Sequence, residues 1–486
     1  MPSVRCARTS DCIGVEDDAV ESGTDAALAC AVMHVLFRDG YADREYLESY
    51  TAGHAALESH LQSRTPAWAS EITSIPVEEI EAFARLYGQT QRSYLRLGFG
   101  FSRSRNGAVQ MFSASCLPAV TGAWKYPGGG ALYAHGGIYN LDKTLIEGLD
   151  VCNTEVRLLD QSRIGSILTG NPRDLGDGPP VTALFIQNTN PMNVAPDLGK
   201  VREGFLRDDL FVCVHEQFMT ETAEMADIVL PATTFLEHDD LYVAGGHTHL
   251  QVTRAIIEPL GETRSNHDVI CALAERLGAS HPGFDTNAWD LMDDTLRLSG
   301  YADAESIWKG HWEDRALSFE ESHFLNGFGH PDGKFHFAPD WSKIGGNHYN
   351  MPRLPDHDAN IDNRDDAHPY RLVTAPARSY LNTSFTETAT SQTREGRPEA
   401  QIHHEVCAEL GLDGGGLVRI GNGQGSVVVH VRPTYGTRRG TVIVESIWPN
   451  RAFVEGIGIN LLVSAEAGRP NGGAVFHDTA VWLRAA

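Results

Sequence analysis

The chain has 486 residues, 42% of them hydrophobic, and 64 acidic against 39 basic side chains give it a net charge of -25. This length exceeds what one hydrophobic core normally serves, so we expect two to four domains. The strong acidity argues against DNA, RNA or an anionic membrane surface as the main partner, and no apolar run is long enough to span a bilayer.

The N-terminal part of the chain predicts a mostly helical region. Residues up to about 22 show no hydrophobic periodicity and are expected to be irregular. A helix capped by Thr24 or Asp25 follows, with an apolar stripe from Ala27 to Leu36. Further helices are expected at 42–50, 54–63, 76–87 (with Pro76 in the first helical position) and 107–122, and a strand is expected at 93–101.

Residues 182–216 predict a βαβ unit. TALFIQ (182–187) and LFVCVHE (210–216) are typical of buried strands in a parallel sheet, and a polar loop and the helix LGKVREGFL join them. Residues 216–237 then predict a polar loop, a short helical turn and another buried strand ending at Pro231. Ligands of such sheets bind at the loops that follow the strands, so both polar loops are candidate sites.

The C-terminal part changes character. Residues 263–298 predict helix, and 326–369 are rich in Gly, His, Asp, Asn and Pro, which is typical of loops or a linker. After Tyr370 come short β segments (RLVTA, LVRIG, SVVVHVR and GTVIVES) separated by glycine-rich turns. Short, closely spaced strands of this kind indicate a compact β-barrel.

Cysteine and histidine patterns point to no metal site. The eight cysteines include no CxxC, and the spacing of Cys6 and Cys12 fits no common zinc or iron–sulfur motif. The pairs His247/His249 and His403/His404 lack a third ligand, so we interpret them as structural or solvated. Reduced thiols and the lack of a signal-peptide pattern predict a cytoplasmic location. No GxSxG, P-loop or HExxH motif supports a hydrolase or a nucleotide triphosphatase.

An ordered set of segments from about Gly23 to the end resembles the molybdopterin-dependent oxidoreductases of the dimethyl sulfoxide reductase family. The segments are GTDAALACAVMHVLFRDGYADREYLESYT, LGFGFSRSRNG…LPAVTGAWKYPGGG, QNTNPMNVAPD, VHEQFMTETAEMADIVLPATTFLE, QVTRAIIEPLGETRSNHDVICALAERLG and RLVTAPARSYLNTSFTET…NGGAVFHDTAVWL. The resemblance implies a multidomain α/β fold, with dimethyl sulfoxide reductase-like layers, parallel sheets and a C-terminal six-stranded, double-psi-like β-barrel. It also implies a molybdenum or tungsten ion carried by two molybdopterin guanine dinucleotides, and two-electron redox or oxygen-atom transfer on a small substrate.

This resemblance suggests a division of the chain. We expect an irregular N-terminus (1–22), a partial α/β domain (23–135), an α/β dinucleotide-binding-like domain (136–262), a helical or irregular connecting region (263–365) and a C-terminal β-barrel that binds molybdopterin dinucleotide (366–486).

The residues that match the family's cofactor contacts lie on polar loops. Asn side chains offer donors and an acceptor to pterin, ribose or phosphate; Asx turns would also explain them, but the resemblance favours contact with the cofactor. Helix capping would also explain Thr220 and Thr222, and packing would explain His477. Glu216 stands where family members often carry Asp. The predicted cofactor contacts are Gly98, Gly100, Asn106, Asn188, Asn190, Pro191, Glu216, Thr220, Thr222, Asp227, Thr374, Arg378, Asn382, Thr383, Ser384, Asn460 and His477; no catalytic or metal-ligating residue is assigned.

Two family features have no counterpart in this sequence. The family's N-terminal segment carries a CxxCxxxC-type motif for a [4Fe–4S] cluster and a side chain that ligates the metal, and neither can be placed here. Three interpretations stay open. The chain is the C-terminal two-thirds of an oxidoreductase that acts with a complementing N-terminal fragment or an electron-transfer subunit, a non-catalytic pterin-dinucleotide-binding module, or a truncated inactive remnant.

Overall fold

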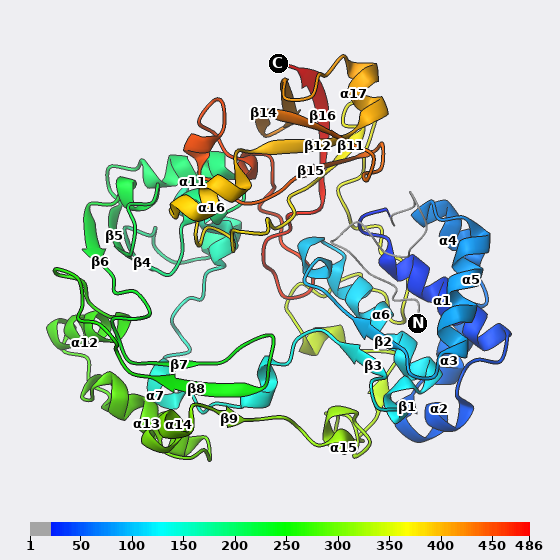
Figure 1. Cartoon of the computed structure of the whole chain (residues 1–486), viewed down its shortest axis with the longest axis horizontal. Coiled ribbons are helices and arrows are strands. Elements are labelled where there is room, and N and C mark those ends of the chain that lie inside the picture. The colour runs from blue at the N-terminus through cyan, green and yellow to red at the C-terminus, as the bar shows by residue number, and fades with distance from the viewer. Residues whose placement is uncertain (1–20) are drawn as a thin grey trace.

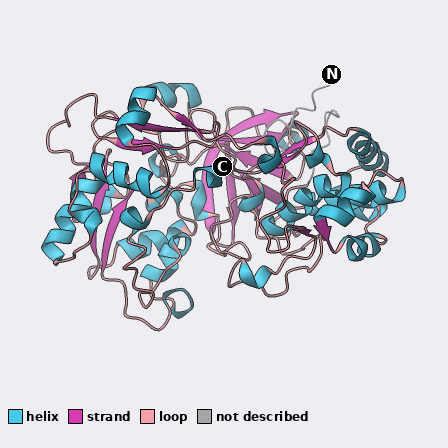
Figure 2. Cartoon of the chain, turned by 90° about the horizontal axis from the view of Figure 1, so that it is seen from below, coloured by secondary structure: helices cyan, strands magenta, loops and turns pink. Residues whose placement is uncertain are grey.

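The computed structural model describes residues 21–486. Figure 1 shows a helical lobe at right, a β-barrel at top, and two small sheets with their helices at left. Figure 2, from below, shows helices concentrated toward the two ends of the long axis. The predicted irregular stretch 1–22 and the cysteines Cys6 and Cys12 lie almost wholly outside the described residues.

The helical lobe is built around α1 (Asp25–Arg38), which is buried on most of its circumference. Asp43 caps α2 by accepting a hydrogen bond from the backbone N–H of Tyr46. The structure adds a helix that was not predicted, α4, which Thr65 caps. Pro76 is the N-cap of α5 and not its first helical residue. The lobe comprises α2 (Arg44–Tyr50), α3 (His54–Leu61), α4 (Pro66–Thr73), α5 (Val77–Gln89), α6 (Gly107–Thr121) and the parallel strands β2 (Tyr94–Arg96) and β3 (Gly130–Leu132).

The βαβ prediction is confirmed by a three-stranded parallel sheet of β4 (Ala183–Gln187), β5 (Phe211–Glu216) and β6 (Ile228–Pro231). One face packs on α8 (Ile164–Leu168), α10 (Pro191–Val194) and α11 (Leu198–Phe205). The prediction that these strands are buried is correct for this face only. On the opposite face Phe185, Phe211 and Ile228 are 40%, 46% and 46% exposed.

A second small sheet follows, with β7 (Asp240–Tyr242), β8 (His249–Thr253) and β9 (Glu313–Asp314). The helical prediction for 263–298 corresponds to α12 (Asn266–Leu277) and α13 (Ala288–Leu298), and α14 (Ala304–Gly310) comes next. The remaining short elements are β1 (Thr51–Ala52), β10 (Phe335–His336), α7 (Thr144–Glu147), α9 (Pro172–Leu175), α15 (Phe319–Ser322), α16 (Ala389–Glu395) and α17 (His404–Leu410).

The segment 326–369 is not a loose linker. Phe337 is fully buried in the core of the helical lobe, and β10 pairs with β1. Arg64 of that lobe forms an ion pair with Asp356. The segment therefore returns the chain from the second small sheet across the helical lobe and into the barrel.

The barrel prediction is confirmed. Six strands close in the order β11-β15-β12-β14-β13-β16 around an aliphatic core that includes Ile402, Val418 and Val442. The alternating apolar residues of each strand point inward, which is why short strands suffice to fill the interior. The strands are β11 (Tyr370–Val373), β12 (Glu399–His403), β13 (Leu417–Asn422), β14 (Gly425–Thr434), β15 (Thr441–Val444) and β16 (Thr479–Ala485).

Candidate cofactor site

The loops that follow β4 and β5 are joined by a buried threonine. Thr222 is fully buried; its hydroxyl donates to Asn190 Oδ1 at 2.6 Å and accepts from the backbone N–H of Met192 at 3.1 Å. The two polar loops thus form one rigid rim at the carboxyl ends of the strands. The side-chain oxygen of Asn190 and the hydroxyl of Thr222 already have protein partners, so their direct contact with a cofactor stays a prediction.

Two asparagines of the C-terminal part bind this rim. Asn450 Nδ2 donates to the backbone oxygen of Met192 at 2.9 Å and to Asn193 Oδ1 at 3.2 Å. Asn460 Nδ2 donates to the backbone oxygen of Asn193 at 2.6 Å, while Asn460 Oδ1 is buried and has no hydrogen-bond partner within residues 21–486. Asn460, predicted as a cofactor contact, therefore lies inside the junction between the sheet and the barrel.

Glu221 extends the junction to a barrel loop. Its carboxylate accepts hydrogen bonds from the backbone N–H groups of Asn450 at 3.2 Å and Arg451 at 2.9 Å. The guanidinium of Arg451 in turn donates to both carboxylate oxygens of Glu387, each at 2.8 Å. This chain of contacts fixes the loop 378–387 relative to the rim.

Exposed polar side chains lie on both sides of this junction, and among them Asn188 Oδ1 accepts a hydrogen bond from Asn266 Nδ2 at 3.4 Å. Asn188 has a φ of +57° at the end of β4, and Asn382 has a φ of +53° in the barrel loop. Both are exposed, as are Arg378 and Ser384. Within residues 21–486 the guanidinium of Arg378 has no hydrogen bond or ion pair. These residues are presented to solvent, with amide, guanidinium and hydroxyl groups available.

A second group of predicted contacts lies where the helical lobe meets the barrel. Thr374 donates to the backbone oxygen of Phe476 at 3.1 Å, and the Arg103 guanidinium lies 5.5 Å from the centre of the Phe476 ring. The backbone N–H of His477 donates to the Arg103 oxygen at 2.9 Å. Burial, and next the positive charge of Arg103, lower the pKa of His477 to about 4, so this imidazole is neutral at neutral pH.

The loop 98–107 combines open and crowded glycines. A Cβ at Gly98 would meet only the backbone N of Gly100, at 4.0 Å, so this part of the loop is open. A Cβ at Gly107 would lie 1.8 Å from the backbone oxygen of Phe101, so no other residue fits there. Asn106 is buried; it donates to two backbone oxygens at 2.8 Å and accepts from Gln110 at 2.6 Å. Its amide is thereby fully occupied in holding the helical lobe together.

Asp227 lies away from the other predicted contacts. Its carboxylate accepts from the backbone N–H of Val212 at 2.7 Å, at the start of β5, whereas Glu216 ends that strand. Ligands of parallel sheets bind at the carboxyl ends of the strands. In the structure Asp227 links the beginnings of β5 and β6, at the end of the sheet opposite to Glu216, and its contact with a cofactor stays a prediction.

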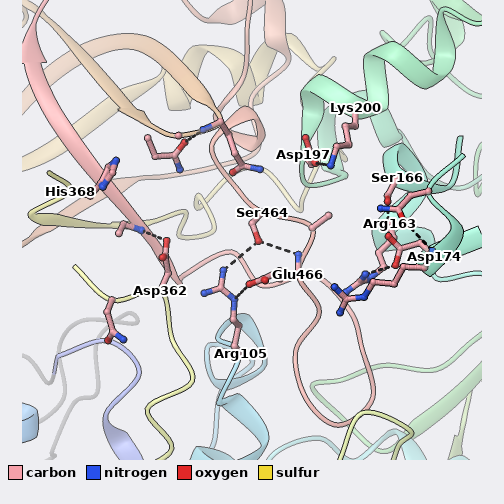
Figure 3. A pocket seen from close by; sticks show the side chains of 18 of the residues that line it. Arg105, Arg163, Ser166, Asp174, Asp197, Lys200, Asp362, His368, Ser464 and Glu466 are labelled. Atoms are coloured by element: carbon pink, nitrogen blue, oxygen red, sulfur yellow. Dashed lines mark hydrogen bonds and ion pairs between the residues drawn. The ribbon is translucent and has the colours of Figure 1, made fainter. Parts of the chain in front are cut away.

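A charged cleft of about 480 Å³ lies near Arg105, and none of the predicted cofactor contacts lines it. Several of its basic side chains form ion pairs with neighbouring carboxylates. As Figure 3 shows, Arg105 meets Glu466 at 3.0 Å and Ser464 at 3.3 Å. Lys200 meets Asp197 at 3.1 Å, and Arg163 forms an ion pair with Asp174. Sequence patterns did not indicate this cleft, because its lining comes from segments far apart in the chain.

Two known protein families match this chain, and together the matches cover most of its length. The family model "Molybdopterin oxidoreductase" matches residues 8–276, and "Molydopterin dinucleotide binding domain" matches residues 370–480. The chain belongs to the molybdopterin oxidoreductase family. The second match covers most of the six-stranded barrel.

The relatives of this chain are longer than the chain itself. It is 31% identical to "Probable oxidoreductase YoaE" of Bacillus subtilis, over 96% of this chain and 67% of the relative. It is 26% identical to the trimethylamine-N-oxide reductase of Haemophilus influenzae, over 90% of this chain and 60% of that protein. The chain thus spans about two-thirds or less of the relatives it matches. The resemblance to the dimethyl sulfoxide reductase family is confirmed.

A solved structure supports the fold. Acetylene hydratase from Pelobacter acetylenicus superposes with a TM-score of 0.77 at 18% identity, covering 96% of this chain and 71% of that one. In residues 21–486 of the present chain, no three His, Cys, Asp or Glu side chains gather into a metal-binding group. Within the same residues, no helix is long and apolar enough to cross a membrane.

Proposed function

We propose that this chain forms the dinucleotide-holding part of a molybdopterin-dependent oxidoreductase that carries out two-electron redox or oxygen-atom transfer on a small substrate. The observation that carries the proposal is the pair of polar rims that the barrel brings together: the loops after β4 and β5 on one side, and the loop 98–107 on the other. The barrel part reaches the first through the hydrogen bond between Glu221 and Arg451, and the second through the backbone N–H groups of Phe476 and His477, which donate to the Arg103 oxygen. Two rims on one barrel suit a cofactor with two dinucleotide arms.

The residues present fit a guanine dinucleotide chemically. Exposed Asn188 and Asn382 offer amide donors and acceptors for a purine or ribose, and the free guanidinium of Arg378 suits a diphosphate. Glu216 offers a carboxylate for the donor edge of guanine. We assign Gly98 and Gly100, whose backbone is accessible, to the second dinucleotide.

When bound, the cofactor supplies a molybdenum or tungsten centre able to exchange two electrons or an oxygen atom. The protein's part is to bind and orient the two arms through the rims. We propose that a complementing polypeptide supplies the metal ligand and the [4Fe–4S] cluster that are typical of the family, and that the division into domains at about residues 135, 262 and 365 describes the chain. Trimethylamine N-oxide and dimethyl sulfoxide, for which two of the relatives are named, represent the size and polarity of the expected substrate.

Cofactor content tests the proposal. The protein is purified from cells that make molybdopterin guanine dinucleotide; bound guanine nucleotide is measured after acid release, and molybdenum and tungsten by mass spectrometry. Nucleotide together with metal is expected. Nucleotide without metal would favour the non-catalytic module, and the absence of nucleotide would refute the proposal.

A matched pair of variants locates the site. Arg378→Ala removes the free guanidinium from the rim, whereas Arg394→Ala removes an exposed guanidinium from α16 in the same part of the chain. Only the first should reduce the bound nucleotide, and neither should change the melting temperature by more than about 2 °C, since surface substitutions are near neutral. Equal nucleotide content in both variants would remove Arg378 from the site.

A further inference from the structure

We propose that the charged cleft near Arg105 binds a small phosphate ester that also carries hydroxyl groups, of the kind found in sugar phosphates and nucleoside monophosphates. None of the predicted cofactor contacts lines this cleft, so the inference goes beyond the proposed function and does not rest on it. The ligand would touch four parts of the chain at once. They are the part that carries the β4–β5–β6 sheet (the sheet part), the helical lobe, the segment 326–369 and the barrel part.

The lining of the charged cleft is almost wholly polar. Of its 19 residues only Gly423, Ala465 and Ala480 lack a polar side chain. The volume of about 480 Å³ falls in the range of small-molecule sites, about 300–1,000 Å³. An apolar ligand would cover these charged and polar groups without offering them hydrogen bonds, which is costly. The cleft therefore suits a polar ligand of small to moderate size.

One wall of the cleft, from the sheet part, is basic. It carries Arg163, Arg173 and Lys200, of which the first and the last lie on the right in Figure 3. Arg163 forms an ion pair with Asp174, and Lys200 meets Asp197 at 3.1 Å. Arg173 is exposed, and its guanidinium has no hydrogen bond or ion pair with any residue of 21–486. A free guanidinium binds a phosphate group through two parallel hydrogen bonds.

Arg163 and Arg173 also line a neighbouring cavity of about 340 Å³. The two arginines therefore stand where the two cavities meet, and an anionic group placed there is within reach of both side chains. The net charge of the chain is -25, so its overall field does not attract an anion. Local guanidinium donors must supply the attraction, and this border is where the cleft concentrates them.

The opposite wall offers carboxylates that are held in place by the backbone. Asp362 Oδ2 accepts a hydrogen bond from the N–H of Ala480 at 2.7 Å, and Asp365 Oδ1 accepts one from the N–H of His368 at 2.6 Å. The other oxygen of each carboxylate, Asp362 Oδ1 and Asp365 Oδ2, has no hydrogen-bond partner among the described residues. Such oxygens accept hydrogen bonds from hydroxyl groups and repel a second anion. The wall thus favours a ligand with one anionic end and a body rich in hydroxyls.

Two amide side chains on the same wall favour a phosphate ester over a free amino acid. Asn363 and Gln424 are exposed, and neither side chain forms a hydrogen bond in the described part of the chain. A free amino acid also has opposite charges for the two walls, but it would leave both amides without a partner. A sugar or a base has additional donors and acceptors that these amides can bind.

Calorimetric titration of the purified chain tests the proposal. Ribose 5-phosphate, adenosine monophosphate, inorganic phosphate, ribose and the amino acid glycine are compared at constant ionic strength. At least one of the first two should bind about tenfold more tightly than each of the other three, because only these two engage both walls and the amides. The tighter of the two shows whether the source is a sugar phosphate or a nucleotide. Inorganic phosphate or glycine binding as tightly as both would overturn the proposed ligand class.

Matched pairs of variants locate the site. Arg173→Ala should weaken the binding of the tighter phosphate ester about tenfold or more. Arg202→Ala, which removes an exposed guanidinium of α11 that lines neither cavity, should leave it unchanged. Asp365→Asn turns the free acceptor oxygen into a donor, so it should weaken the ester but not inorganic phosphate. Asp366→Asn, at the next residue and outside the lining, should affect neither.

Two further measurements keep the result interpretable. All four substituted side chains are exposed, so the melting temperature without ligand should stay within about 2 °C. Bound guanine dinucleotide should be the same in every variant, because the cleft is separate from the cofactor rims. Its loss in Arg173→Ala would place the cofactor in the cleft and refute this inference while leaving cofactor binding intact. Equal affinities of Arg173→Ala and Arg202→Ala, or no binding of either phosphate ester, would also overturn the proposal.

Discussion

The carboxylate of Glu221 accepts a hydrogen bond from the backbone N–H of Arg451 at 2.9 Å, across 230 residues of sequence. One acidic side chain of the β5 loop thereby holds the end of a short helical turn in the barrel part. The contact sets the spacing between two segments to which we assign one dinucleotide.

Replacing Glu221 should loosen the junction. In Glu221→Gln one acceptor oxygen becomes a donor facing the N–H groups of Asn450 and Arg451, and hydrogen bonds to a charged group are lost, so the free energy of unfolding should fall by about 1.5–3 kcal/mol. Urea denaturation measures the change. Glu203→Gln, on the exposed side of α11, is the control and should be neutral. A Glu221→Gln variant as stable as the unchanged protein would contradict the role given to Glu221.

Thr222 should matter for stability whether or not the cofactor is bound. Thr222→Val keeps the shape but leaves Asn190 Oδ1 and the N–H of Met192 without their partner in a fully buried place, at a cost of about 1–3 kcal/mol. The thermal unfolding of cofactor-free protein is the measurement. Arg378→Ala should show the reverse pattern, with less bound nucleotide and unchanged stability. A Thr222 variant that loses only nucleotide would instead support direct cofactor contact.

Asp478 holds two buried arginines. It is 1% exposed and meets Arg371, itself 3% exposed, at 3.0 Å and Arg105 at 3.6 Å. Asp478→Asn leaves buried positive charge uncompensated, so unfolding should become easier by about 3–5 kcal/mol. Glu466→Gln removes the exposed partner of Arg105 and should cost about 1 kcal/mol or less. Similar losses in the two variants, compared by urea denaturation, would contradict this assignment.

His477 should make the protein less stable in mild acid. Its pKa is lowered from 6.5 to about 4 in the folded chain, so between these values the unfolded state binds more protons and stability falls as the pH falls. From pH 7 to pH 5 the loss should be about 2 kcal/mol. His477→Asn should remove that part of the slope. The variant is needed for comparison because Asp25, whose pKa is raised to about 6 by burial, acts in the opposite direction. Parallel pH curves for the two proteins would contradict the prediction.

Local pattern was sufficient for the barrel and the βαβ unit, because alternating apolar residues and glycine turns act over a few residues. Local pattern was insufficient to predict the contacts that join the sheet to the barrel at the candidate cofactor site. Asn190 and Asn460 are ordinary polar residues in the sequence, and only contacts over long separations, such as Asn450 with Met192 at 258 residues, show that the junction uses them. Strand hydrophobicity predicted burial of Phe185, but hydrophobicity does not reveal whether a partner covers the strand.

The seam of the barrel has a consequence for how the protein is made. Strand β16 lies between β11 and β13, and it pairs with β11 across about a hundred residues. The barrel cannot close during synthesis until residue 485 has left the ribosome, so β11 to β15 must wait with apolar side chains and strand edges uncovered. Non-local pairing of this kind slows folding and exposes the chain to aggregation. Chaperone dependence should therefore concentrate between the synthesis of β11 and the emergence of β16, and loss of β16 alone should leave the barrel unable to close.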